Sequence, residues 1–217
     1  MSAQATPTAT TDRQTTAGTT AVAAPPAVAN PGPLGLAAFA TTTFILSMFN
    51  AGLVSDKGVP VVLGMALAYG GIAQLLAGMW EFRTGNTFGA TAFSSYGAFW
   101  LSFWAFNQFF AKDIKSAADL GHAVGLYLIA WGIFTAYMFI ASLRTTGAIA
   151  VVFFLLAATF IILGIGESGA STGTVKLGGW VGLGAAIAAW YASFAEVTNA
   201  TFARTVFPTA PLRRPET

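Results

Sequence analysis

The sequence predicts an all-α membrane protein with six transmembrane helices in one compact domain. Of its 217 residues, 55% are hydrophobic and only 8% are charged, and the mean hydropathy is +0.68. In soluble domains about a quarter of the residues are charged. Six apolar runs also follow one another, each near the roughly 20 residues that a helix needs to cross a bilayer. These observations indicate a polytopic membrane protein.

The predicted spans are separated by short polar or glycine-rich turns. A Thr/Ala/Pro-rich tail, residues 1–29, precedes them and is predicted to be disordered because it has little apolar surface to bury. The transmembrane domain covers residues 30–208, and residues 209–217 form a short C-terminal tail. The expected spans are 34–54, 59–80, 88–111, 122–142, 148–166 and 178–202.

An even number of spans places both termini on one side of the membrane. Basic residues favour the cytoplasmic side of a membrane. The side of the termini carries slightly more of them, which predicts cytoplasmic termini. The two sets are Arg83, Arg144, Arg204, Arg213 and Arg214 against Lys57, Lys112, Lys115 and Lys176.

Composition excludes several functions. The chain has no cysteine and one histidine, His122, so thiol chemistry and a histidine-based metal site are not expected. No nucleophile and base are paired by any motif, which argues against an enzyme. The net charge of +2 does not favour nucleic acid as a partner. No cofactor is predicted, and the lipid bilayer is the expected surrounding.

The first span begins with an unusual segment, Asn30-Pro31-Gly32-Pro33-Leu34-Gly35-Leu36. Pro33 suits the first helical turn, where its missing N–H leaves no bond unmade. The remaining free N–H groups carry partial positive charge and suit an anion such as a carboxylate. A plain helix-entry turn is the alternative interpretation.

Polar residues inside the spans are candidates for a pathway, because such groups are costly in lipid. Glu196 is either a proton-linked group or a structural charge paired with Arg204. Gln74 either lines a pathway or bridges two helices. Glu81 and Glu167 lie near span ends, where we expect water to solvate them.

Helical periodicity also sorts residues into faces. Phe39, Tyr96 and Leu156 each fall on a stripe of one span, although aromatic and small-residue stripes are more often packing surfaces. The pairs Gly121/Gly125 and Gly178/Gly182 have the GxxxG spacing of closely packed helices. They predict tight packing within the bundle or between subunits.

Several motifs occur in order along the chain and together resemble one family. The sequence is similar to the acetate uptake transporter family, the succinate–acetate permease group, from Asn30 to about Pro208. Besides residues 30–36, the motifs are Tyr69-Gly70-Gly71-Ile72-Ala73-Gln74, Gly85-Asn86-Thr87-Phe88-Gly89, the run 91–100, Trp131-Gly132-Ile133-Phe134-Thr135, Glu196-Val197-Thr198-Asn199 and the run 202–206.

The resemblance implies six helices per subunit, a homo-hexamer in the plasma membrane and a separate pathway in each subunit. It implies a constriction formed by Phe39, Tyr96 and Leu156, bordered by Thr42 and Ala189. Substrate-binding residues are implied at Asn30, Pro31, Pro33, Leu34, Thr42, Gln74, Ala189, Glu196 and Asn199.

Two positions depart from the family pattern. Gly32 stands where alanine is commoner, and Glu167 stands where an uncharged polar residue such as Asn is expected. An extra negative charge on the pathway would repel an anion.

The expected function is transport of acetate and similar short carboxylates, as an anion channel or a proton-coupled permease. Ammonia or ammonium transport is a second hypothesis, weakened by the lack of a histidine pair. A non-transport oligomeric scaffold or acid-stress sensor is the third.

Overall fold

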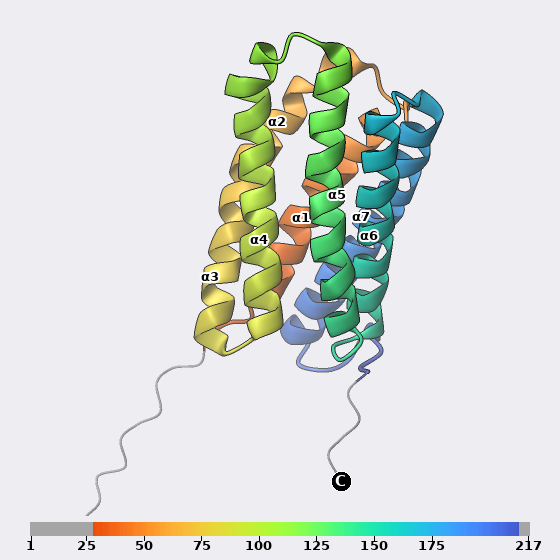
Figure 1. Ribbon diagram of the computed structural model, residues 1–217. Helices are drawn as coiled ribbons and strands as arrows, with labels where there is room; N and C mark the ends of the chain where they lie inside the picture. The colour runs from red at the N-terminus through yellow and green to blue at the C-terminus, as the bar shows by residue number, and fades with distance from the viewer. Residues whose placement is uncertain (1–27, 213–217) are drawn as a thin grey trace, which may run out of the picture.

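The computed structural model describes residues 28–212, which form a bundle of long helices (Figure 1). Among these residues there is no strand, only an isolated bridge between Thr146 and Pro211, so the all-α prediction is confirmed for them. The predicted tail 1–29 lies outside the described residues except at its last two positions. The elements are α1 (Gly32–Asn50), η1 (Asp56–Gly58), α2 (Pro60–Leu67), η2 (Ala68–Ala73), α3 (Gln74–Thr84), α4 (Thr87–Ala105), η3 (Phe106–Phe110), η4 (Ala111–Asp113), α5 (Ala117–Ser142), α6 (Gly147–Ser168) and α7 (Thr172–Thr201).

Within residues 28–212, each predicted span corresponds to helical structure. α2, the π-helical turn η2 and α3 run on as one rod, which is the second span. Five stretches are long and apolar enough to cross a membrane: α1, the rod from Asp56 to Thr84, α5, α6 and α7. The remaining predicted span corresponds to α4, whose Ser, Thr and Gly residues make it less apolar.

Local sequence explains where the helices begin and end. Pro33 lies in the first turn of α1, as predicted. The side chain of Asn86 accepts a hydrogen bond from the Gly89 N–H and so caps α4. Gly85 adopts a left-handed conformation, with φ of 78°, which ends α3. The turn at Gly85 and Asn86 therefore reverses the chain between the second and third spans.

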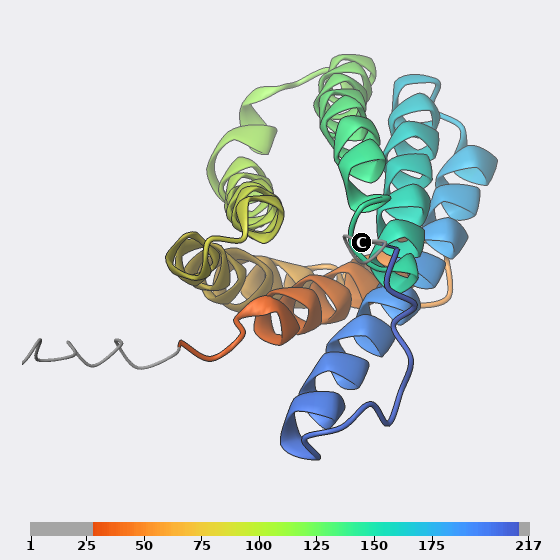
Figure 2. The same ribbon diagram turned by 90° about the horizontal axis from the view of Figure 1, so that it is seen from below.

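The helices pack in two groups. α5 lies against α6 and α6 against α7, while α3 lies against α4; α1 packs on α7 and also contacts the α2–α3 rod. Figure 2 shows α1 crossing between these two groups. α4 and α5 meet through aromatic side chains, including Tyr96 and Phe134 with ring centroids 5.5 Å apart. α1 and α4 therefore enclose the centre of the bundle together with α6.

Both predicted glycine pairs lie at contacts within the chain. A Cβ atom on Gly125 would lie 2.8 Å from the Gly164 carbonyl oxygen of α6. One on Gly182 would meet Ser47 of α1 and Thr159 of α6. The glycines thus allow close approach between helices of one subunit.

The two described ends of the chain lie at the same end of the bundle (Figure 1), as an even number of crossings requires. The segment 209–212, which the sequence assigns to the C-terminal tail, is hydrogen-bonded to the start of α6. The Gly147 N–H donates to the Ala210 carbonyl at 2.7 Å, and the Leu212 N–H donates to the Thr145 carbonyl at 2.9 Å.

Candidate functional site

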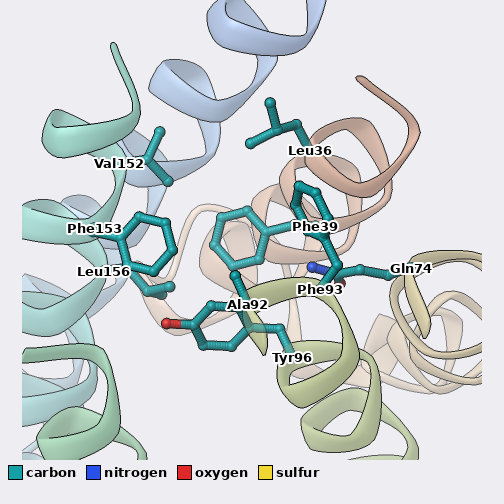
Figure 3. A pocket seen from close by; sticks show the side chains of 9 residues that line it. All are labelled: Leu36, Phe39, Gln74, Ala92, Phe93, Tyr96, Val152, Phe153 and Leu156. Carbon is teal, nitrogen blue, oxygen red and sulfur yellow. The ribbon is translucent and has the colours of Figure 1, made fainter. Parts of the chain in front are cut away.

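A small cavity of about 20 Å³ lies at the centre of the bundle. Phe39 of α1, Tyr96 of α4 and Leu156 of α6 all line it, so the structure brings the predicted constriction together (Figure 3). This volume holds about one water molecule. The three side chains are at most 4% exposed. The predicted constriction is therefore closed in this conformation.

Five further lining residues escaped the sequence analysis. Each lies three or four positions before a constriction residue on the same helix, and is therefore on the same face one turn nearer the helix N-terminus. This spacing is the signal that identifies them. They are Leu36 on α1, Ala92 and Phe93 on α4, and Val152 and Phe153 on α6.

Gln74 supplies the amide group of the cavity wall. Its side chain is fully buried, and neither Oε1 nor Nε2 has a hydrogen-bond partner among the described residues. In Figure 3 the amide extends from one side, facing Phe153 and Leu156 across the aromatic rings. Gln74 therefore does not bridge two helices, which was one of the two interpretations of the sequence. Its donor and its acceptor are both unused, and both lie in the wall of the closed cavity, covered by the surrounding side chains.

The backbone before Gln74 explains its position. The π-helical turn η2 ends at Ala73, and Gly70 within it packs so closely that a Cβ atom would lie 2.7 Å from Thr42 Oγ1. π-Turns are frequent at functional sites because one extra residue rotates the residues that follow. Thr42 itself is fully buried and donates its hydroxyl to the Ala38 carbonyl. Thr42 thus packs beside the cavity with its proton already used.

Ala189 of α7, the other predicted border residue, is fully buried in the hydrophobic core of the bundle. Neither Thr42 nor Ala189 lines the cavity itself. A separate, open groove of about 540 Å³ lies on the outside of α6 and α7, and Leu155 and Tyr191 are among its lining residues.

The predicted anion pocket at the start of α1 has a different geometry. Asn30 Oδ1 accepts the Gly32 N–H at 2.9 Å, and Asn30 Nδ2 donates to Glu196 Oε2 at 3.1 Å. Glu196 Oε2 lies 3.0 Å and Glu81 Oε1 lies 3.5 Å from the position of a Cβ atom on Gly32. Two protein carboxyl groups therefore stand where an external carboxylate was expected. They interact favourably with the positive end of the helix.

Glu81 corrects a second expectation. It is only 2% exposed and not solvated, because the start of α1 and Gly89 of α4 cover it. Its Oε2 accepts hydrogen bonds from Asn86 Nδ2 at 2.9 Å and Thr84 Oγ1 at 3.1 Å. Asn30, Glu81 and Glu196 therefore form a polar cluster near the N-termini of α1 and α4, which we call the polar mouth. Glu167 is half-buried near the far end of α6 and does not line the cavity.

The remaining predicted site residues have structural partners. The Pro33 carbonyl accepts the Ser193 hydroxyl at 2.7 Å, Pro31 is half-buried beside it, and Leu34 is exposed. Asn199 uses its whole amide on the C-terminal loop: Oδ1 accepts from the N–H groups of Val206 and Phe207, and Nδ2 donates to the Phe207 carbonyl. Asn199 therefore fastens the C-terminal loop, and it does not line the central cavity.

Glu196 is held by Asn30, and Arg204 is exposed beyond the end of α7. The predicted pairing of these two charges is replaced by a bond across the mouth. Asn30 and Glu196 thus join the start of the first span to the end of the last.

The fold defines a helical membrane protein whose spans enclose a small, closed central cavity. The chain belongs to the GPR1/FUN34/yaaH family, whose model matches residues 13–214. The resemblance drawn from the sequence motifs is thereby confirmed.

The alignment with this chain covers different shares of two known relatives. The chain is 40% identical over 181 residues to the succinate-acetate/proton symporter SatP of Escherichia coli, covering 83% of this chain and 95% of SatP. It is 45% identical over 177 residues to ammonia transport outward protein 2 of Saccharomyces cerevisiae, covering 79% of this chain and 62% of that protein. The chain thus spans less than two thirds of the yeast relative.

A solved structure shares the fold. The bacterial acetate channel SatP superposes with a TM-score of 0.78 at 40% identity, covering 85% of this chain and all of that one.

Proposed function

We propose that this chain transports acetate and similar short carboxylates across a membrane, through the space between α1, α4 and α6. One observation carries the proposal: Phe39, Tyr96 and Leu156 converge from three helices on a closed cavity whose wall includes Gln74, a residue with an unpartnered amide. An apolar ring with one polar group suits a small molecule that has an apolar end and a hydrogen-bonding end. The relatives named for acetate support this substrate class.

The proposed route enters at the polar mouth of Asn30, Glu81 and Glu196 and reaches the constriction about two helical turns further along α1. Because the cavity holds about one water, the aromatic side chains must part to admit an acid. Phe39, Tyr96 and Leu156 are thus the gate, with Thr42 and Ala189 packed behind it. The proposed role is transport and not catalysis.

We also propose an oligomeric state, a location and an orientation in the membrane. The pathway lies within one chain, which is consistent with a homo-hexamer that has one pathway per subunit. Large apolar side chains such as Phe154, Ile161 and Leu126 are exposed on the outer helix faces, where lipid or a neighbouring subunit would cover them. The bias of basic residues supports cytoplasmic termini, and the plasma membrane is the location that the family resemblance implies.

Uptake of labelled acetate into proteoliposomes that contain the purified protein tests the proposal. Empty liposomes measure the leak of neutral acetic acid through lipid. Uptake above that leak, inhibited by unlabelled short carboxylates such as lactate, is the expected result. An imposed proton gradient then separates a proton-coupled permease from an anion channel that follows voltage alone.

Ammonia transport is the second candidate, favoured by the name of the yeast relative. Inhibition by ammonium and not by carboxylates would support it. Absence of both fluxes would indicate a scaffold or sensor in place of a transporter.

A further inference from the structure

The cavity wall contains no charged group among its nine lining residues. Its polar side chains are those of Gln74 and Tyr96. The Tyr96 hydroxyl lies 3.0 Å from Thr135 Oγ1, and Thr135 donates its own hydroxyl to the Trp131 carbonyl at 2.7 Å. Tyr96 is therefore the donor in its bond and has no proton left for a substrate. Gln74 alone offers both a free N–H and a free carbonyl oxygen.

These two free groups distinguish between the two forms of a carboxylic acid. A carboxylate has acceptors only, so it would pair with Nε2 while Oε1 of Gln74 faced its negative charge. It would also enter a site whose lining residues include no cation, and burying an unpaired charge is strongly unfavourable. The neutral acid has one donor and one acceptor. It therefore satisfies both amide groups at once.

We propose that the neutral carboxylic acid is the form that crosses the constriction, held by two hydrogen bonds to the amide of Gln74. The acid O–H donates to Oε1 and Nε2 donates to the acid carbonyl, in a closed ring of two bonds. The acid takes its proton from water on one side and releases it to water on the other. Each carboxylate therefore moves with one proton and without net charge. The inference rests on the transport function proposed above.

The same geometry predicts a second class of substrate. A small primary amide such as acetamide has the size of acetic acid and also presents one N–H donor and one carbonyl acceptor in the required positions. Acetamide does not ionise in the pH range of interest. We therefore expect the site to carry acetamide and similar neutral amides, which separates the shape of the substrate from its charge.

The test measures labelled acetate and labelled acetamide uptake into proteoliposomes at a series of equal internal and external pH values. Total acetate is constant, and the leak into empty liposomes is subtracted. Above the pKa of a carboxylic acid, which is about 4 to 5, the neutral fraction falls about tenfold per pH unit. Protein-dependent acetate uptake should fall in the same proportion. Acetamide uptake should stay constant, and acetamide should inhibit acetate uptake.

Gln74→Met keeps the length of the side chain and removes both hydrogen-bonding groups. We expect it to lower acetate and acetamide uptake together, each at least about tenfold. Gln108→Met is the matched control, because Gln108 is exposed in η3 and far from the cavity lining. Thermal unfolding in detergent checks that both variants fold.

The outcomes are distinct. If acetate uptake above the leak is independent of pH and acetamide is neither carried nor inhibitory, the anion is the permeant form. The transport function then stands and this inference is overturned. If neither compound enters faster than into empty liposomes, the transport function fails and the inference with it. The measurements on the unmodified protein decide the question even if Gln74→Met does not fold.

Discussion

The hydroxyl of Tyr96 on α4 lies 3.0 Å from Oγ1 of Thr135 on α5. Thr135 is fully buried and donates to the Trp131 carbonyl, so the tyrosine proton must be the one shared between the two helices. This bond fixes the orientation of a constriction side chain from a helix that does not line the cavity. α5 therefore holds one side chain of the proposed gate through Thr135.

Thr135→Val should destabilise the protein, because it leaves the buried Tyr96 hydroxyl without a partner. The expected loss in the free energy of unfolding is about 1–3 kcal/mol. Thermal unfolding in detergent measures it. The double variant Thr135→Val with Tyr96→Phe removes both polar groups and should recover most of the loss. Additive effects of the two changes would show that the two hydroxyl groups are not coupled.

Leu156→Ala should widen the constriction and admit larger carboxylates. The change removes a side chain that lines the cavity and is 3% exposed, at a stability cost of about 2–5 kcal/mol. The ratio of lactate to acetate uptake should rise. Leu155→Ala is the matched control, because Leu155 lines the outer groove and not the central cavity. An equal rise in both variants would argue against the constriction as the size filter.

Alanine substitutions at two glycines of the second span should change stability in opposite directions. A Cβ atom on Gly78 would lie 2.5 Å from the backbone nitrogen of Ser94, so Gly78→Ala should force α3 and α4 apart and lower the unfolding temperature. Gly64 has open space around it, and Gly64→Ala should stabilise its helix by about 0.5–1 kcal/mol. Unfolding curves of the two variants check the contrast. A loss in both would mean that α2 tolerates no side chain at that site either.

Asn199→Ala should release the C-terminal loop. It removes three hydrogen bonds to Val206 and Phe207, and we expect faster limited proteolysis of the segment after α7. Asn199→Asp keeps the two acceptor bonds and loses one donor bond, so it should have a smaller effect. Acetate uptake should persist in both variants, since the amide of Asn199 is bonded to the loop and does not line the central cavity. Loss of uptake with an intact loop would restore Asn199 to the substrate-binding set.

Much of the fold follows from the sequence because a bilayer restricts which secondary structures can cross it. Apolar runs of the right length predicted the described helices, and Pro33 lies in the first turn of α1 as the sequence predicted. Phe39, Tyr96 and Leu156 converge as the family resemblance implied. Periodicity alone would have placed each on a face, but not the three faces at one point.

The polar details could not be read in the same way. Glu81 looked solvated near a span end, but the start of a distant helix covers it, and Asn30 reaches Glu196 across 166 positions of sequence. Asn199 belongs to a family motif, but its amide is hydrogen-bonded to the C-terminal loop. Hydrogen-bond partners of this kind depend on tertiary contacts, which a linear pattern does not contain.

The orientation of Gln74 depends on the number of residues in the π-helical turn from Ala68 to Ala73. Each residue of an α-helix turns the chain by about 100°, so one residue more or less in this turn rotates everything after it by that amount. Gln74 would leave the cavity and Glu81 would leave the mouth in the same step, although neither had been replaced. The spacing between Gly70, which packs against Thr42, and Gln74 therefore constrains the site along with the identity of these residues.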